Sequence, residues 1–401
     1  MSFNHGVRTQ EISSGIITMR NANAGLPFVV GTALKGPINV PTYCESFEEF
    51  STLFGYDDDW TKYTLNEFAY SQFMIYGVRP AIFVNVRDPN KKITVEEEEV
   101  EAPITANDII GVDSSGNISG LQLIKQVYTR FSLVPSLILC PSWSQNPAVS
   151  AAMTAAAKNI DGLFEAIAIT DIDTSAVENY QQVNTWKTNN SYTDERQIVC
   201  WPKIKLGEKI YNMSTALAGV IGVLDNENGD VPYQSPSNQA IKATGLCRSN
   251  GEEIILTHSQ GTLLNSQGVT TVINRDGLNA WGNYMGSYPR ENDPLDFIPV
   301  RRMFNFIRNS FVLNYFSQID QPLNRRTLKH LVDNLQSWLN GYVTAGNLVS
   351  GRVEYSEEEN PAEALASGKL TLHLYITPPS PLQELVGLLE YDLSGYDNFT
   401  L

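Results

Sequence analysis

Residues 136–140 read SLILC, residues 166–170 read AIAIT, and residues 197–201 read QIVCW. Each run is short and apolar, which is typical of a buried strand. Helical patterns over residues 148–160 and 175–187 fill the gaps between the runs. Strands joined by helices of this length form a parallel sheet with right-handed crossovers. We therefore predict an α/β layer in the middle of the chain.

Two further buried strands are predicted upstream of this layer, over residues 28–33 and 81–86. A short helix is expected between them. Ser46 and Glu49 have the spacing of a capping box, and Gly55 ends the apolar face that follows. The first hundred residues are thus predicted to form an α+β region.

The C-terminal third mixes predicted strands and helices. Glycine-punctuated runs from Gly261 to Ile273 indicate a β-rich pattern with tight turns. Helical patterns follow over residues 301–316 and 320–341, and residues 370–376 alternate like a half-buried strand. The predicted fold class is α/β and α+β, multidomain. It comprises an α/β layered middle domain, an α+β C-terminal domain, and extended strand arms at both ends.

Composition divides the chain into five regions. A charged stretch over residues 91–120 and a loop rich in asparagine and proline over residues 225–237 mark internal boundaries. A chain of 401 residues has room for two or three compact units. The predicted regions are an N-terminal extended arm (1–20), an N-terminal α+β region (21–100), an α/β middle domain (101–235), a C-terminal α+β domain (236–380) and a C-terminal extended arm (381–401).

Both ends of the chain are predicted to be extended segments. The first is mostly polar and has too few apolar residues for a core of its own. It must therefore pair with a sheet elsewhere, in this chain or in another. The residues that we assign to the strand arms are Val7, Thr9, Glu11 and Ile12 at the N-terminal end, and Leu385, Val386, Leu388, Leu389, Tyr391 and Leu393 at the C-terminal end.

Charge argues against a nucleic-acid partner. The chain has 44 acidic and 28 basic residues, which gives a formal net charge of −16. Nucleic-acid binders carry a basic face, and a phosphate backbone would repel this composition. No apolar signal region follows Met1, and no window of about eighteen uncharged apolar residues occurs. Neither secretion by a signal peptide nor direct membrane insertion is expected.

The sequence carries no signature of a catalytic, metal or cofactor site. Its four cysteines lie far apart, so we expect reduced, structural thiols in a protein made in the cytoplasm. Its four histidines lack metal-ligand spacing. Asp171 and Asp173 follow a predicted strand, where they would either hold a cation or cap the next helix. We favour capping, because Thr174 and Ser175 are also good capping residues.

One predicted helix carries a local concentration of positive charge. Arg301, Asn305 and Arg308 fall on one face of the helix, since seven residues make nearly two turns, and Arg302 adds to the stripe. In a chain of net charge −16, this stripe either faces a partner molecule or pairs with acidic loops of the same chain. The sequence leaves both alternatives open.

Short motifs recur along the whole chain in a characteristic order. They are FNHGV at 3–7, FVVGTA at 28–33, the stretch 46–55 with its Phe-Gly end, 111–121, LLN at 263–265, GVT at 268–270, RDG at 275–277, Trp281-Gly282, Arg301-Arg302, 364–368 and KLT at 369–371. In order and spacing they resemble the contractile tail sheath family of myophages and of phage-tail-like bacteriocins.

This resemblance implies a structural protein that is not an enzyme. Members of the family polymerise as stacked hexameric rings around a tail tube in a metastable extended state, and contraction drives the tube through the target cell envelope. The implied partners are further copies of the chain, the tail tube protein, and baseplate and tail-terminator proteins. The implied location is a virion tail or phage tail-like particle, after synthesis in the bacterial host cytoplasm.

The resemblance also implies how the chain is oriented in such a particle. The two arms would add strands to the sheets of neighbouring subunits. The middle domain would face outward, and the C-terminal domain would face the tube. The candidate tube-contacting residues are then Arg301, Arg302, Asn305 and Arg308.

Two alternative functions stay open. A soluble α/β hydrolase-like enzyme would place Asp171 and Asp173 near a cleft and would turn over a substrate as a monomer. A static tail or capsid component would form tubes that never shorten. The sequence also leaves open whether the particle is a phage, a bacteriocin or another injection device.

Overall fold

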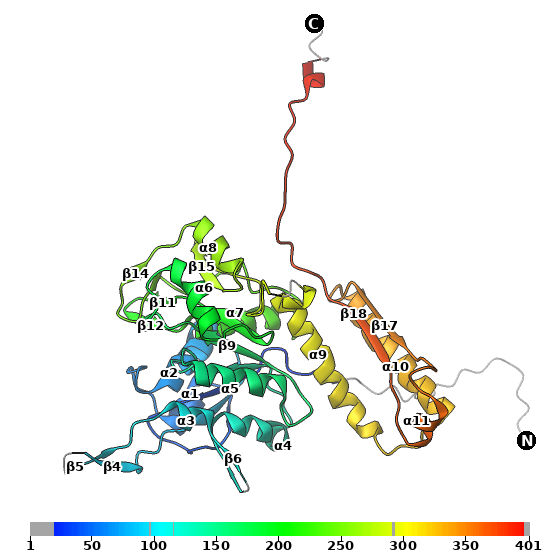
Figure 1. Cartoon of the computed structure of the whole chain (residues 1–401), viewed down its shortest axis with the longest axis horizontal. Coiled ribbons are helices and arrows are strands. Elements are labelled where there is room, and N and C mark those ends of the chain that lie inside the picture. Colours follow the sequence, from blue (N-terminus) through cyan, green and yellow to red (C-terminus); the bar gives the residue numbers. More distant parts are fainter. Residues whose placement is uncertain (1–19, 96–97, 115, 291–292, 397–401) are drawn as a thin grey trace, which may run out of the picture.

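The computed structural model describes residues 20–95, 98–114, 116–290 and 293–396. At its centre lies a six-stranded sheet of order β10-β9-β8-β1-β3-β2 (Figure 1). Five strands are parallel, and β2 runs antiparallel to β3 at one edge. The five buried runs predicted from the sequence are the parallel strands, which confirms the α/β layer. The strands are β1 (Pro27–Gly31), β2 (Thr42–Cys44), β3 (Ala81–Asn85), β8 (Leu137–Leu139), β9 (Ile167–Asp171) and β10 (Gln197–Cys200).

Helices cover both faces of this sheet. Alternate residues of β1 face opposite layers, so Phe28 lies in one buried cluster with Val149 and Val29 in another with Leu217. The first layer contains α3 (Ala106–Ile110), η2 (Gly120–Gln126), α4 (Val127–Phe131) and α5 (Pro147–Lys158). The second contains α1 (Phe47–Phe54), α2 (Thr64–Ala69), the π-helical η1 (Tyr70–Tyr76) and α7 (Met213–Glu227).

The sheet crosses the predicted boundary at residue 100. Its strands β1 and β3 come from the predicted region 21–100, whereas β8, β9 and β10 come from the predicted domain 101–235. The two regions therefore share one core, and the predicted division between them is corrected. The residues around the boundary leave this core as two protruding hairpins (Figure 1). These are β4 (Lys92–Val95) with β5 (Glu98–Glu101), and β6 (Asp113–Ser114) with β7 (Asn117–Ile118).

The predicted boundary at residue 235 is corrected for the same reason. β11 (Lys203–Leu206) pairs across it with β13 (Gly245–Cys247), in a four-stranded antiparallel sheet of order β12-β11-β13-β14. Residues from 236 to about 297 thus pack on the α/β body. The further elements here are α6 (Tyr180–Asn189), β12 (Lys209–Tyr211), β14 (Glu253–Ile254), α8 (His258–Asn265), β15 (Thr271–Asn274), β16 (Leu278–Trp281) and η3 (Pro294–Asp296).

A smaller C-terminal unit begins at α9 (Ile298–Tyr315), which lies between the body and α10 (Arg325–Thr344) (Figure 1). Met303 and Phe306 of α9 share a buried cluster with Leu339 of α10. Two antiparallel strands, joined by a segment that includes α11, pack on the same cluster. The elements of this unit are η4 (Phe316–Gln318), β17 (Ser350–Glu354), α11 (Ala362–Ala366) and β18 (His373–Thr377), followed at the chain end by η5 (Leu393–Tyr396).

Beyond β18, residues 378–392 form an extended tail with neither helix nor strand, and this tail runs away from the rest of the molecule (Figure 1). An extended C-terminal segment was the prediction. The four cysteines are buried free thiols, as expected. Among the helices in the described ranges, none is long and apolar enough to span a membrane.

Candidate functional site: the polar face of α9

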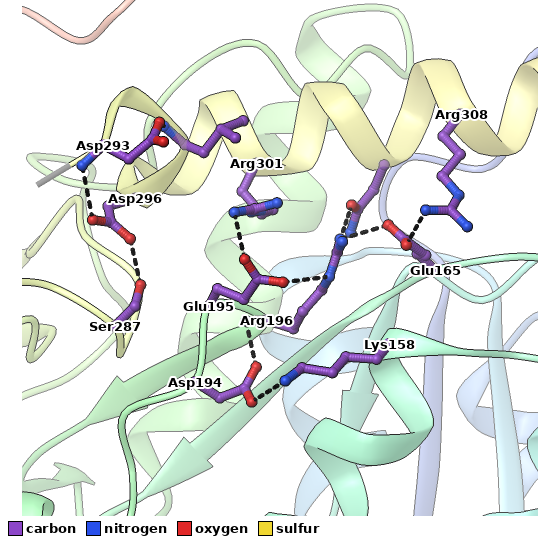
Figure 2. Close-up of polar contacts among 12 residues, drawn as sticks. Lys158, Glu165, Asp194, Glu195, Arg196, Ser287, Asp293, Asp296, Arg301 and Arg308 are labelled. Carbon is purple, nitrogen blue, oxygen red and sulfur yellow. Dashed lines mark hydrogen bonds and ion pairs between the residues drawn. The ribbon is translucent and has the colours of Figure 1, made fainter. Parts of the chain in front are cut away.

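The helix α9 has one face for each of its two neighbours. It starts directly after Phe297, with Pro299 in its first turn, where a missing backbone N–H costs no helical hydrogen bond. Its apolar face, with Met303, packs toward α10. Its polar face carries the predicted stripe and lies against the α/β body (Figure 2).

Arg302 makes the most buried ion pair of this face. Its Nη1 lies 3.0 Å from Asp225 Oδ1 on α7, its Nη2 contacts Asp225 Oδ2, and Nη2 also donates to the carbonyl of Ala24 at 3.1 Å. The two side chains are only 3% and 2% exposed. A bidentate pair of this kind satisfies both charges inside the protein, so it joins α9 firmly to α7.

The other stripe residues belong to a chain of alternating charges (Figure 2). Arg301 Nη2 lies 3.1 Å from Glu195 Oε2, and Glu195 also faces Arg196. Arg196 Nη1 lies 2.6 Å from Glu165 Oε2, and Arg308 contacts the other oxygen of Glu165. Asn305 is inserted between these groups.

Asn305 ties this network to the backbone of the sheet. Its Oδ1 accepts from Arg196 Nη1, and its Nδ2 donates to the carbonyl of Ala166 at 3.2 Å. Burial lowers the pKa of Arg196; the charge of Glu165 opposes this shift and the charge of Arg301 adds to it. The guanidinium stays charged because arginine titrates far above neutral pH.

The stripe is therefore brought together as predicted, but its partners lie in the same chain. Arg301, Arg302 and Asn305 are buried against the body, and Arg308 has a side chain that is 54% exposed. The alternative of pairing within the chain is confirmed. Tube contact by these four residues stays a prediction, and Arg308 is the member with an accessible guanidinium. Sequence reasoning missed Glu165, Glu195 and Asp225, whose only signal is their opposite charge.

α9 also holds the root of the N-terminal arm, through side chains on the same side of the helix as Met303 and not on the polar face. The backbone N–H of Arg20 donates to Asn314 Oδ1 at 2.7 Å, and Asn314 Nδ2 donates to the carbonyl of Arg20 at 2.8 Å. The N–H of Ala22 donates to Ser310 Oγ at 2.9 Å. The root of the arm is thus fixed on α9. The predicted arm residues Val7, Thr9, Glu11 and Ile12 lie outside the described residues.

Sequence comparison finds tail sheath proteins among the relatives of this chain. The chain is 28% identical over 296 residues to the tail sheath protein of Burkholderia phage BcepMu, across 70% of this chain and 61% of that protein, so the match spans less than two thirds of that relative. It is 24% identical over 407 residues to the tail sheath protein of Escherichia phage P2, across 96% of this chain and 94% of that protein. No family model matches the chain.

The fold gives the same result. The helical sheath of the anti-feeding prophage, solved in its contracted state, superposes with a TM-score of 0.70 and covers 98% of this chain and 100% of that chain. Identity is 16%, so this likeness concerns the fold. In sequence and in fold, the chain is similar to contractile tail sheath proteins. These relatives are structural tail sheath proteins and not enzymes, and we refer to the present chain below as the sheath protein.

The two aspartates of the enzyme alternative do not converge on a cleft in the sheath protein. Asp171 is buried at the start of α7, where it accepts from Ser214 N at 2.9 Å and Ser144 Oγ at 3.0 Å. Asp173 accepts from Ser175 N at 2.8 Å and closes a turn. Asp171 thus binds a backbone N–H at the start of α7, and Asp173 closes a turn. The prediction that they cap the helix following residue 175 is wrong, because that helix begins later, at Tyr180, and Asn179 caps it. The described residues include no cluster of metal-ligating side chains.

The C-terminal arm of the sheath protein exposes apolar side chains. Leu385, Leu388 and Leu389 are 83%, 86% and 100% exposed, and Val386, Tyr391 and Leu393 are also largely exposed. Nearby, β17 and β18 form a two-stranded sheet whose outer edges pair with no strand of the described chain. An unpaired edge and an unpaired apolar segment are complementary features.

One basic surface of the sheath protein was missed by sequence reasoning. Arg325, Arg326 and Lys329 are exposed at the start of α10, and no ion pair joins them to a described residue. Phe316 and Ile319, each 65% exposed, lie in the preceding connection. We call these five residues the α10 corner. These residues come from a connection and a helix start, so the helical periodicity that predicted the stripe of α9 did not indicate them.

Proposed function

We propose that the sheath protein polymerises as stacked hexameric rings around a tail tube in a metastable extended state. Contraction of this lattice then drives the tube through the target cell envelope. Similarity to tail sheath proteins supports the general role. The single observation that supports assembly into a lattice of subunits is the exposed C-terminal arm. A monomer gains nothing by holding Leu389 fully exposed in water.

The arm has the chemistry of a strand that completes a partner sheet. Leu389, Tyr391 and Leu393 alternate with Glu390 and Asp392, which gives one apolar and one polar face. A two-stranded sheet such as β17–β18 is only marginally stable by itself and gains stability from a third strand. We therefore place the arm of one copy on the β17–β18 sheet of a neighbour, with the N-terminal arm making a corresponding contact.

Contacts of this kind join different surfaces of two identical chains. Such head-to-tail contacts close into rings or continue as helices, which is the symmetry that stacked rings require. The buried Arg302–Asp225 pair supports a subunit that moves as one body, since α9 is fixed to α7. In this proposal the subunits rotate and slide during contraction while the arms keep them connected.

The tube-facing surface is proposed on the C-terminal unit, and the α/β body with its protruding hairpins faces outward. The α10 corner supports this assignment better than the stripe of α9, because its charges have no partner in the described chain. Positive charge at a helix start is also unfavourable next to the helix dipole and gains from an external anion. Arg308 is the stripe residue that adds to this surface.

Each charge contact with the tube needs only a small free energy. Exposed ion pairs contribute about 0.2–1 kcal/mol each, yet many copies act together along a tail. Weak single contacts also suit an extended state that must be released. Further proposed partners are baseplate and tail-terminator proteins at the two ends of the sheath, within a virion tail or phage tail-like particle.

The proposal is tested by replacing Leu385, Leu388, Leu389 and Tyr391 with serine and examining the full chain by electron microscopy. The matched control replaces Glu384 and Glu390 with glutamine, which leaves the apolar face intact. We expect tubular polymers from wild type and control, and folded monomers from the serine variant. Normal polymers from the serine variant would overturn the arm contact. Tubes that never shorten would favour the static tail component instead.

A further inference from the structure

The root of the C-terminal arm is built differently from the exposed segment beyond it. β18 ends at Thr377, and Pro378, Pro379 and Pro381 follow. Pro378 is buried, and the other two are half-buried. Proline fixes its own φ and favours an extended backbone, so this stretch is a semi-rigid spacer rather than a flexible hinge.

A side chain of the body contacts the arm just past this spacer. Tyr284 Oη donates to Gln383 Oε1 at 2.7 Å. Tyr284 itself is 6% exposed, although its partner lies on the exposed arm. The contact joins residues that are 99 positions apart in sequence, and it links the arm to the body rather than to the C-terminal unit.

The surroundings of Tyr284 hold its hydroxyl in one direction. Its ring stacks on Tyr288 with the ring centroids 3.6 Å apart and the planes 5° from parallel. It also stacks on Phe297, at 4.8 Å and 19°, and the two residues form a β-bridge. Phe297 directly precedes α9. The Tyr284 hydroxyl, which donates to Gln383, is therefore held rigidly next to the residue that precedes α9.

We propose that the Tyr284–Gln383 contact, together with the proline spacer, is a latch that fixes the direction in which the C-terminal arm leaves its own subunit. This inference rests on the proposed function in that the arm binds a neighbouring copy. Tyr284 and Gln383 act as positioning residues, because neither needs to touch the neighbour.

The latch prevents the arm from pairing with the β17–β18 sheet of its own subunit. The unpaired edge of β17–β18 in the same subunit is tethered to the arm, and a short tether gives an effective concentration of the order of millimolar. A flexible arm would therefore fold back and compete with the neighbour. Holding the arm away from its own sheet, as Figure 1 shows, leaves both available for intermolecular pairing.

The latch is tested on protein diluted below the concentration at which it polymerises, by measuring the distance between spin labels at L389C and S367C. The four native cysteines are buried, so the labels go to the introduced thiols. We expect a single narrow distribution for the otherwise wild-type chain. The variants Q383A and Y284F lose the hydrogen bond, and a bond of ordinary strength predicts a roughly fivefold rise in the population of other arm directions.

A conservative variant separates positioning from mere stability. Q383E keeps an acceptor for the Tyr284 hydroxyl and is expected to retain the narrow distribution. The melting temperature should stay the same in all three variants. Combining Y284F with Q383A should add nothing to either change alone, because both remove the same contact.

Unchanged distributions in Q383A and Y284F would overturn the latch. This readout needs no polymer, so it is independent of whether the arm binds a neighbour. If the latch is present but the serine variant of the arm still polymerises, the proposed arm contact fails and the latch stands as a feature of the subunit. If the arm contact holds and the latch variants keep narrow distributions, only the latch fails.

Discussion

Arg302 and Asp225 form the pair in which one substitution has the largest expected effect. Both side chains are almost fully buried and satisfy one another, with the Ala24 carbonyl as a third partner. Removing one member of a buried pair leaves the other charge without a counter-ion in a medium that solvates it poorly. The neighbouring Arg301–Glu195 pair differs, because the Glu195 side chain is 42% exposed and water can replace its partner.

The first prediction compares these two arginines. R302M should lower the free energy of unfolding by about 3–5 kcal/mol, whereas R301M should lower it by about 1 kcal/mol or less. Urea denaturation measures both in the background of the serine variant of the arm, which is expected to stay monomeric. The double variant R302M/D225L, which removes both charges, should recover part of the loss. Equal effects of the two single variants would contradict the assignment of Arg302 as the main link between α9 and the body.

The second prediction concerns Lys187, which α6 inserts into the body. Its Nζ donates to the carbonyls of Gln267 at 2.6 Å and Tyr288 at 3.1 Å, and burial lowers the pKa of Lys187 to about 8. Between this pKa and the ordinary value of 10.5, the unfolded chain binds more protons than the folded chain. The free energy of unfolding therefore rises with pH in that interval.

Relative to K187M, the wild-type protein should gain about 2 kcal/mol of stability from pH 8 to pH 10. The comparison with K187M cancels the titration of tyrosines, which occurs in both proteins. Urea denaturation at intermediate pH values gives the slope. Parallel curves for the two proteins would show that Lys187 keeps an ordinary pKa.

At the scale of elements, strand positions were predictable and domain boundaries were not. Buried strands such as β1 and β9 are continuous apolar runs, and this pattern survives any tertiary arrangement. The boundary at residue 100 failed because sheet neighbours are decided by packing between distant segments. Similarly, α8 replaced a predicted β-rich stretch because the capping box of Thr257 and Gln260 starts a helix there.

The candidate site on α9 could likewise be predicted only where it depends on local sequence. Helical periodicity placed Arg301 and Asn305 on one face correctly, since periodicity is a local property. Their partners Glu165 and Glu195 come from other elements, so no spacing in the sequence connects them. The α10 corner escaped notice because its residues span a connection and a helix start.

The third prediction belongs to this corner. Reversing two charges, R326E/K329E, should reduce assembly on tail tubes at least tenfold, since the change repeats in every subunit along the tube. The matched control K242E/R275E makes the same change of charge at exposed positions of the body and should assemble normally. Co-sedimentation with tubes measures both. The wild-type interaction should weaken as salt rises, because exposed charges are screened. Equal loss in both variants would indicate net charge rather than a local contact.

At the scale of the whole molecule, the described part of the sheath protein is one body with an extended C-terminal tail. The six-stranded sheet, its two helical layers and the antiparallel sheet beside it share buried clusters, and α9 joins this body to the C-terminal unit. The roots of the described ends are fixed, the first on α9 through Asn314 and the last on Tyr284. A rigid body with anchored extensions can keep its neighbours while its orientation changes, which is what a contracting lattice needs.

Electron microscopy of the purified full chain, alone and together with the tail tube protein of the same particle, tests the central claim most directly. We expect tubular polymers from the chain alone, and longer, narrower sheaths around the tube that shorten and widen on triggering. Monomers that persist under both conditions would contradict a self-assembling sheath subunit.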